Sequence, residues 1–192
     1  MLSLVLNEIK DRRTHTELKK NYFSSSMHIS LTDTITEKEA LINRLVEFIS
    51  SVGIAVKEGN TGDDTFVPGL DIRYGTIIFD RERLLYPGDL LHEAGHIAVA
   101  EAAERGSLMG NVTDNKPERQ GEELAAILWS YAACKKTGIP PAVVFHPDGY
   151  KGDSSWFLEN FKNEVFIGLP LLVWMQLTTA EQYPVMTKWL RD

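Results

Sequence analysis

A pentapeptide near the middle of the chain combines two histidines and a glutamate at a spacing suited to metal chemistry. It reads His92-Glu93-Ala94-Gly95-His96. Side chains four residues apart on an α-helix lie on one face, so both imidazoles can bind a single Zn2+. Glu93 would lie beside the metal, where a carboxylate can accept a proton from water. The pattern predicts a zinc-dependent hydrolase and favours one that cuts peptide bonds.

The residues around the pentapeptide predict the helix that this geometry needs. Pro87 suits a first helical position, and Asp89 can cap the helix or lie in its first turn. Gly106 is a plausible stop, so we expect the helix to continue through Ala103. The competing explanation is two histidines that find hydrogen-bond partners on an ordinary core helix. A glutamate directly after the first histidine favours metal binding instead.

A third ligand must come from elsewhere, because a catalytic zinc commonly has three protein ligands and one position for water. The next predicted helix begins near Pro117, ends near Lys136, and carries Glu122 and Glu123 in an apolar setting. A buried carboxylate needs a partner such as a metal, whereas an exposed pair would merely suit the start of a helix. We expect one of the two glutamates to be the ligand and favour Glu123.

Together these residues resemble the gluzincin branch of zinc metallopeptidases. The chain length and the short interval to Glu123 are similar to the small bacterial ImmA/IrrE-type metallopeptidases, whose third zinc ligand is a glutamate on the helix after the motif helix. The resemblance implies a zincin-like metallopeptidase fold, a Zn2+ cofactor and a peptide or protein substrate. It covers residues 70–137, and the run Ala125-Ala126-Ile127-Leu128 departs from the usual pattern of that family.

A polar, turn-rich segment at residues 143–153 carries two further candidates for a catalytic role, His146 and Tyr150. Hydrolysis of a carbonyl group builds negative charge on its oxygen, and a histidine or tyrosine that donates to this oxygen lowers the barrier. Either residue could do so. His146 could instead be a fourth metal ligand, which would close the site, or an exposed residue of a turn.

The remaining pattern predicts a small sheet and several more helices. We expect one strand over 71–80, beside the metal helix, which either pairs with an extended substrate or is a plain core strand. We also expect a short strand at 54–57 and helices over 37–51 and 181–192, the first with Leu41, Leu45, Phe48 and Ile49 facing inward. The fold class is therefore α+β, with a zincin-like sheet packed on the motif helix.

Composition limits the classes of partner. The chain has 192 residues, 43% of them hydrophobic, with a net charge of −7, so nucleic acid is a poor partner. A single cysteine and no apolar segment of membrane-spanning length favour the cytoplasm. We expect a loosely held N-terminal arm at 1–35 and one domain at 36–192. Two alternatives stay open: a non-catalytic metal-binding or regulatory domain, and a metal-dependent hydrolase of a non-peptide amide.

Overall fold

The computed structural model describes residues 31–112 and 120–192. The chain divides into two compact units, residues 1–40 and 41–192. In the first unit, the described residues are the start of helix α2, which runs over Leu31–Ser51 and continues into the second unit. Residues 1–30 of the predicted arm lie outside the described residues, as does the predicted helix start at Pro117.

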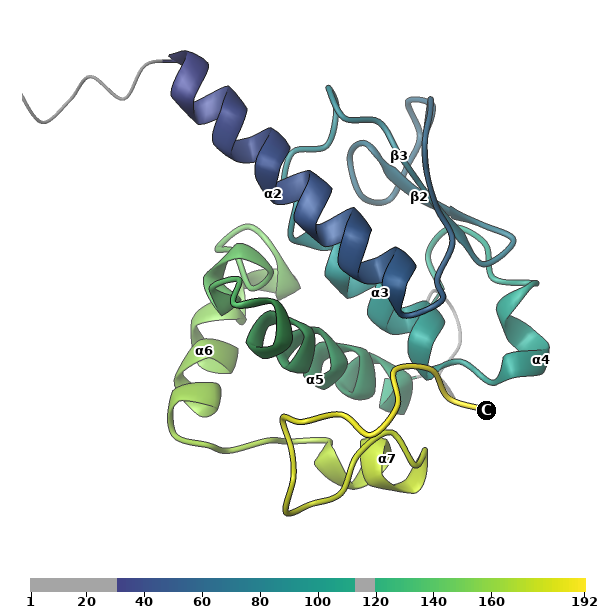
Figure 1. Ribbon diagram of the computed structural model, residues 1–192, viewed down its shortest axis with the longest axis vertical. Coiled ribbons are helices and arrows are strands. Elements are labelled where there is room, and N and C mark those ends of the chain that lie inside the picture. The colour runs from purple at the N-terminus through teal and green to yellow at the C-terminus, as the bar shows by residue number, and fades with distance from the viewer. Residues whose placement is uncertain (1–30, 113–119) are drawn as a thin grey trace, which may run out of the picture. The chain divides into compact units, whose positions relative to one another are not determined.

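The second unit has a mixed α+β architecture, drawn in Figure 1. Its strands are β1 (Val56–Glu58), β2 (Leu70–Arg73) and β3 (Thr76–Phe79). Its helices are α3 (Asp89–Val99), α4 (Ala102–Arg105), α5 (Gln120–Thr137), α6 (Ser154–Lys162) and α7 (Leu169–Trp174). Short 3-10 helices at Pro141–Val143 and Tyr150–Gly152 connect α5 to α6.

The strands form a three-stranded sheet with the order β1-β3-β2, in which β1 is parallel and β2 antiparallel to β3. The prediction of one strand over 71–80 is wrong, because the chain reverses at Tyr74 and Gly75. Both have positive φ angles, 51° and 68°, as the tightest hairpin turns require. Arg73 then pairs with Thr76, and β3 lies in the middle of the sheet.

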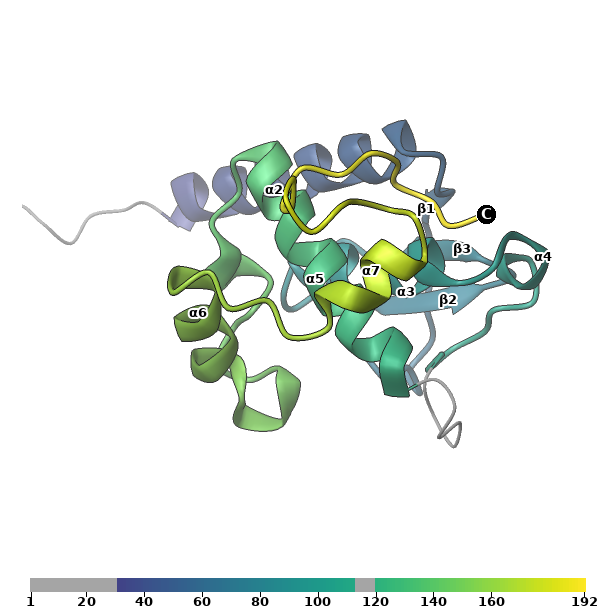
Figure 2. The same cartoon turned by 90° about the horizontal axis from the view of Figure 1, so that it is seen from below.

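Helix α3 lies between the sheet and α5, so the predicted motif helix is in the centre of the unit (Figures 1 and 2). Its side chains Leu90, Leu91 and Ile97 are almost completely buried. Ile42, Leu45 and Ile49 of α2 join the same core, while Leu41 and Phe48 pack against it half-buried. Helix α7 packs against α5. The apolar stripes of these helices therefore enclose the motif from several directions.

Helix α3 ends earlier than the sequence predicts. Ala100 is extended, with φ −67° and ψ 147°, so the helix stops at Val99 rather than at Ala103. Arg191, near the C-terminus, binds the last carbonyl oxygens of α3. The backbone N–H of Arg191 donates to the Ala98 oxygen at 2.9 Å, and its guanidinium donates to the Val99 oxygen at 3.3 Å. A long-range contact of this kind leaves no local sequence signal.

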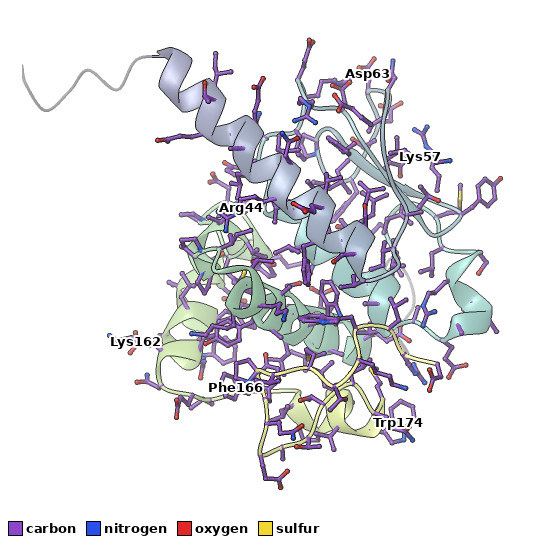
Figure 3. All side chains as sticks on the ribbon, viewed as in Figure 1. Arg44, Lys57, Asp63, Lys162, Phe166 and Trp174 are labelled. Carbon is purple, nitrogen blue, oxygen red and sulfur yellow. The ribbon has the colours of Figure 1, made fainter. Side chains whose placement is uncertain are left out.

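The C-terminal segment is also not the helix predicted over 181–192. It consists of turns, because Pro184 has no N–H for a helical ladder and Thr187 instead donates to the Leu177 oxygen at 2.9 Å. A helix there would place Val185 inward, but this side chain is exposed. Figure 3 shows Trp174 on α7 at the surface, and the Arg191 guanidinium lies 4.8 Å from the centre of its ring.

The helix predicted over 37–51 begins earlier, at Leu31, and ends where expected, before Gly53 with its φ of +93°. Within the described ranges, no helix combines the length and apolar character needed to cross a membrane.

Candidate metal centre

Three side chains from α3 and α5 converge on one point. The Nε2 atoms of His92 and His96 are 3.2 Å apart. The Glu123 carboxylate lies 3.6 Å from His92 Nε2 and 3.4 Å from His96 Nε2. Ligands bound at about 2.0–2.1 Å to a tetrahedral zinc ion are separated by about 3.3–3.4 Å. The donor atoms therefore have the mutual spacing of a tetrahedral metal site.

Glu123, and not Glu122, belongs to this group. Among the described residues, the metal-ligating side chains whose donor atoms all lie within 4.8 Å of one another are His92, His96 and Glu123. Glu122 precedes Glu123 in the first turn of α5 and is half-buried. Helical geometry explains the difference, because adjacent residues point about 100° apart around the helix.

Helices α3 and α5 bring the three side chains together through a close approach of their backbones. Gly95, between the two histidines on α3, faces Ala126 on α5. The buried Ser130 hydroxyl lies 2.7 Å from the Ala126 oxygen and 3.2 Å from the Leu91 oxygen, so its one proton is shared between the two helices. Sequence reasoning missed Ser130; its only signal is its helical register with Ala126 and Glu123.

Burial sets the protonation of the group. It lowers the pKa of His92 to about 4, with a smaller contribution from His146, so this imidazole is neutral near pH 7 with a lone pair available to a metal. Burial also raises the pKa of Glu123. The buried surroundings of the cluster therefore disfavour an unpaired charge on these side chains, and a bound divalent cation would offset this free-energy cost.

Glu93 lies beside the cluster and is 7% exposed. Burial, followed by the negative charges of Asp89 and Glu123, raises its pKa to about 8. A cation at the three donor atoms would act in the opposite direction, because a nearby positive charge favours the carboxylate. Glu93 thus has the environment of a group that can gain and lose a proton close to neutral pH.

Tyr150 also reaches the cluster. Its ring packs edge-on against the His92 imidazole, with ring centres 5.2 Å apart. Its hydroxyl is buried and has no hydrogen-bond partner among the described residues, and burial raises its pKa well above the usual value. The phenol therefore stays protonated, and its O–H is a buried hydrogen-bond donor without an acceptor among the described residues.

His146 has different surroundings. Its Nε2 atom lies 3.0 Å from the Asp89 carboxylate, and its ring stacks on Tyr86 with centres 3.8 Å apart. Because it is only 8% exposed, His146 is not an exposed residue of a turn. It also lies outside the three-residue metal group. Asp89 lies in the first turn of α3, after the N-cap residue Gly88, and its carboxylate binds His146. No local sequence pattern predicts this pairing.

Comparison with known proteins identifies no relative: no protein-family model, curated protein or solved structure matches the chain. The likeness to gluzincins stays a prediction that rests on the motif residues.

Proposed function

We propose that this chain is a zinc-dependent hydrolase that cleaves peptide bonds, built on a zincin-like arrangement of α3, α5 and the sheet. One observation carries the proposal. His92, His96 and Glu123 meet at the separations of a tetrahedral zinc site, with the buried Glu93 beside them. Cys134, a single buried thiol on α5, supports a reducing compartment such as the cytoplasm.

Three protein ligands leave one coordination position of a tetrahedral ion for water or substrate. Zinc in such a site polarises a carbonyl group and makes water more acidic. Glu93 accepts a proton from the attacking water and delivers it to the nitrogen of the leaving amine as the C–N bond breaks. The products are a carboxylic acid and an amine, and Glu93 returns to its starting state.

Tyr150 supplies the second contribution of the protein. Attack on the carbonyl carbon places negative charge on its oxygen, and a buried donor without a partner can hydrogen-bond to that oxygen. The Tyr150 hydroxyl is such a donor, beside His92. Since its pKa is raised, the phenol keeps its proton over the working range of Glu93.

A second candidate, hydrolysis of a non-peptide amide, is favoured by one feature of the sheet. Strand β3 has neighbours on both sides, so an added substrate strand would need an outer edge of the sheet, and β2 is the edge strand that packs against α3. There the Gly110 N–H donates to the Ile72 oxygen at 2.8 Å, and Met109 pairs with Arg73. This occupied stretch shortens the edge available to an extended peptide.

The decisive experiment combines metal analysis with the Glu93→Gln variant. We expect purified protein to bind about one equivalent of zinc, and the variant to bind zinc equally well while losing hydrolysis of an unfolded protein or a peptide library. Cleavage of small amides but not of peptides would select the second candidate. Zinc binding without hydrolysis of either class would favour the non-catalytic metal-binding domain. Equal activity in the variant would remove Glu93 from the mechanism.

A further inference from the structure

We infer that His146 is a positioning residue: its bond to Asp89 holds the segment 146–154 against the first turn of α3 and thereby aims Tyr150 at the metal centre. The catalytic meaning of this role rests on the proposed function, whereas the structural relationship does not.

The side chain of His146 joins the segment to the start of the metal helix. Asp89 is the first residue of α3, three positions before His92, and accepts the His146 contact at 3.0 Å. Tyr86 covers one face of the imidazole, with the two rings only 11° from parallel. The Tyr86 hydroxyl donates in turn to Asp148. The imidazole is thus held at its Nε2 atom by Asp89 and on one face by Tyr86.

The backbone of His146 organises the turn that leads to Tyr150. Its carbonyl oxygen accepts hydrogen bonds from the Gly149 N–H at 3.0 Å and from the buried Ser154 hydroxyl at 2.5 Å. Gly149 also packs against the imidazole so closely that a Cβ atom there would lie 3.2 Å from Nε2. His146 therefore holds together the two ends of the segment 146–154.

Tyr150 depends on this arrangement because its own backbone is in an unfavourable region. Its φ angle is +55°, and Lys151 has the same value. Two such non-glycine residues in succession persist only when their surroundings hold them. The Tyr150 ring lies 5.0 Å from Phe145 and 5.6 Å from Phe157, contacts that fix its plane while its hydroxyl forms no bond to the described residues.

The same contacts argue against His146 as the donor to substrate. Its Nε2 atom is engaged by Asp89, and one ring face is covered by Tyr86. Tyr150, by contrast, packs on the ligand His92; its hydroxyl, like the Nδ1 atom of His146, is buried without a partner in the described part of the chain. The structure assigns the donor role to Tyr150 and the positioning role to His146.

Nitration by tetranitromethane, mapped by peptide mass spectrometry, tests the positioning role without an activity assay. Exposed Tyr74 is the reactive control in the same sample. Buried Tyr183, whose hydroxyl donates to the Leu128 oxygen at 2.8 Å, reports global unfolding. We expect the unmodified chain to protect Tyr150, and His146→Ala and Asp89→Ala to raise its nitration at least about tenfold while Tyr183 stays protected.

Two matched variants isolate the contact. His146→Gln, whose amide nitrogen can take the place of Nε2, should restore protection of Tyr150. Asp148→Asn changes the neighbouring Tyr86 contact but leaves the Asp89–His146 bond, and should also keep Tyr150 protected. Protection that survives in both His146→Ala and Asp89→Ala overturns the inference. Nitration of Tyr150 in Asp148→Asn to the same extent as in His146→Ala also overturns it.

Kinetics then separate this inference from the proposed function. His146→Ala should bind zinc like the unmodified chain, lower kcat as Tyr150→Phe does, and add no further loss to Tyr150→Phe, because both changes remove the same donor. Multiplying losses would show that His146 acts independently of Tyr150 and would overturn the inference. Absence of any hydrolysis, with the expected nitration pattern, would overturn the proposed function alone.

Discussion

Gly95 of α3 and Ala126 of α5 are in backbone contact: a Cβ atom added to Gly95 would lie 2.8 Å from the Ala126 oxygen. The helices approach this closely only because position 95 has no side chain. His92 and His96 flank Gly95 on one helix, and Glu123 lies three residues before Ala126 on the other. This contact therefore sets the distance between the histidines and the carboxylate.

Gly95→Ala should weaken zinc binding although alanine is the better helix former by about 1 kcal/mol. The added methyl group must push α5 away, and overpacking of this kind costs about 1–3 kcal/mol. We expect lower stability in denaturant unfolding and at least about a tenfold loss of zinc affinity. Gly106→Ala is the control, because no atom lies within 4 Å of the new Cβ and its φ is −65°. Equal zinc affinity in the two variants would contradict this account.

Glu123→Gln and its neighbour Glu122→Gln form a matched pair for metal affinity. Loss of a residue that merely supports a ligand weakens metal binding about 10–100-fold, so the loss of a ligand should exceed this range. We expect Glu123→Gln to release zinc under competition with a chelator and Glu122→Gln to keep it, since only Glu123 lies with the histidines. The reverse order of affinities would assign the site to Glu122.

The stability of the metal-free protein should fall as pH rises through the interval set by Glu93. Its pKa is about 8 in the folded chain and near 4.5 when unfolded, so the folded state binds the proton more tightly. The resulting stabilisation is present below about pH 4.5 and lost by about pH 8.

Denaturant unfolding in the presence of a chelator, at a series of pH values, measures this loss. We expect it to amount to several kcal/mol, and Glu93→Gln to reduce the slope. The variant is needed because His92, with its lowered pKa, acts in the opposite direction: its contribution is lost as pH falls from 6.5 to about 4. Identical slopes with and without Glu93 would show that this carboxyl does not titrate in that interval.

Arg191 should matter more for stability than its charge suggests. Its guanidinium donates to the Val99 oxygen, pairs with Glu101 at 2.7 Å and covers the Trp174 ring. We expect Arg191→Ala to cost about 1–3 kcal/mol in unfolding experiments, because it leaves the Val99 oxygen at the end of α3 without its partner, while the backbone N–H at position 191 still donates to Ala98. Lys188→Ala, which removes an exposed pair with Asp192, is the control and should have little effect. A comparable loss from both would refute a specific role for the side-chain contacts of Arg191.

The sequence predicts best those features of the site that depend on residues within a single helix. The spacing of His92 and His96 follows from helical periodicity, the apolar setting selects Glu122 or Glu123 as the third ligand, and the resemblance to the small metallopeptidases favours Glu123. The structure brings these three side chains together, while their role as metal ligands stays a prediction.

The sequence fails to predict features that depend on contacts between distant residues or on the backbone conformation of one or two residues. Two residues with positive φ, Tyr74 and Gly75, turn an apparently continuous strand into a hairpin. Arg191 binds the carbonyl oxygen of Val99, 92 residues away, where α3 ends before Ala103. The pairing of Asp89 with His146 joins residues 57 positions apart. No local pattern of hydrophobicity contains this information, because tertiary contacts override it.

The pairing of Met109 and Gly110 with the outer edge of β2 has one further consequence. An unpaired strand edge is a template on which a second molecule can extend the sheet, and exposed edges of this type promote aggregation. Here the carbonyl oxygen of Ile72 already accepts a hydrogen bond from the Gly110 N–H. The short segment at Met109 and Gly110 thus protects this side of the sheet from intermolecular strand addition, and its deletion should lower the solubility of the protein.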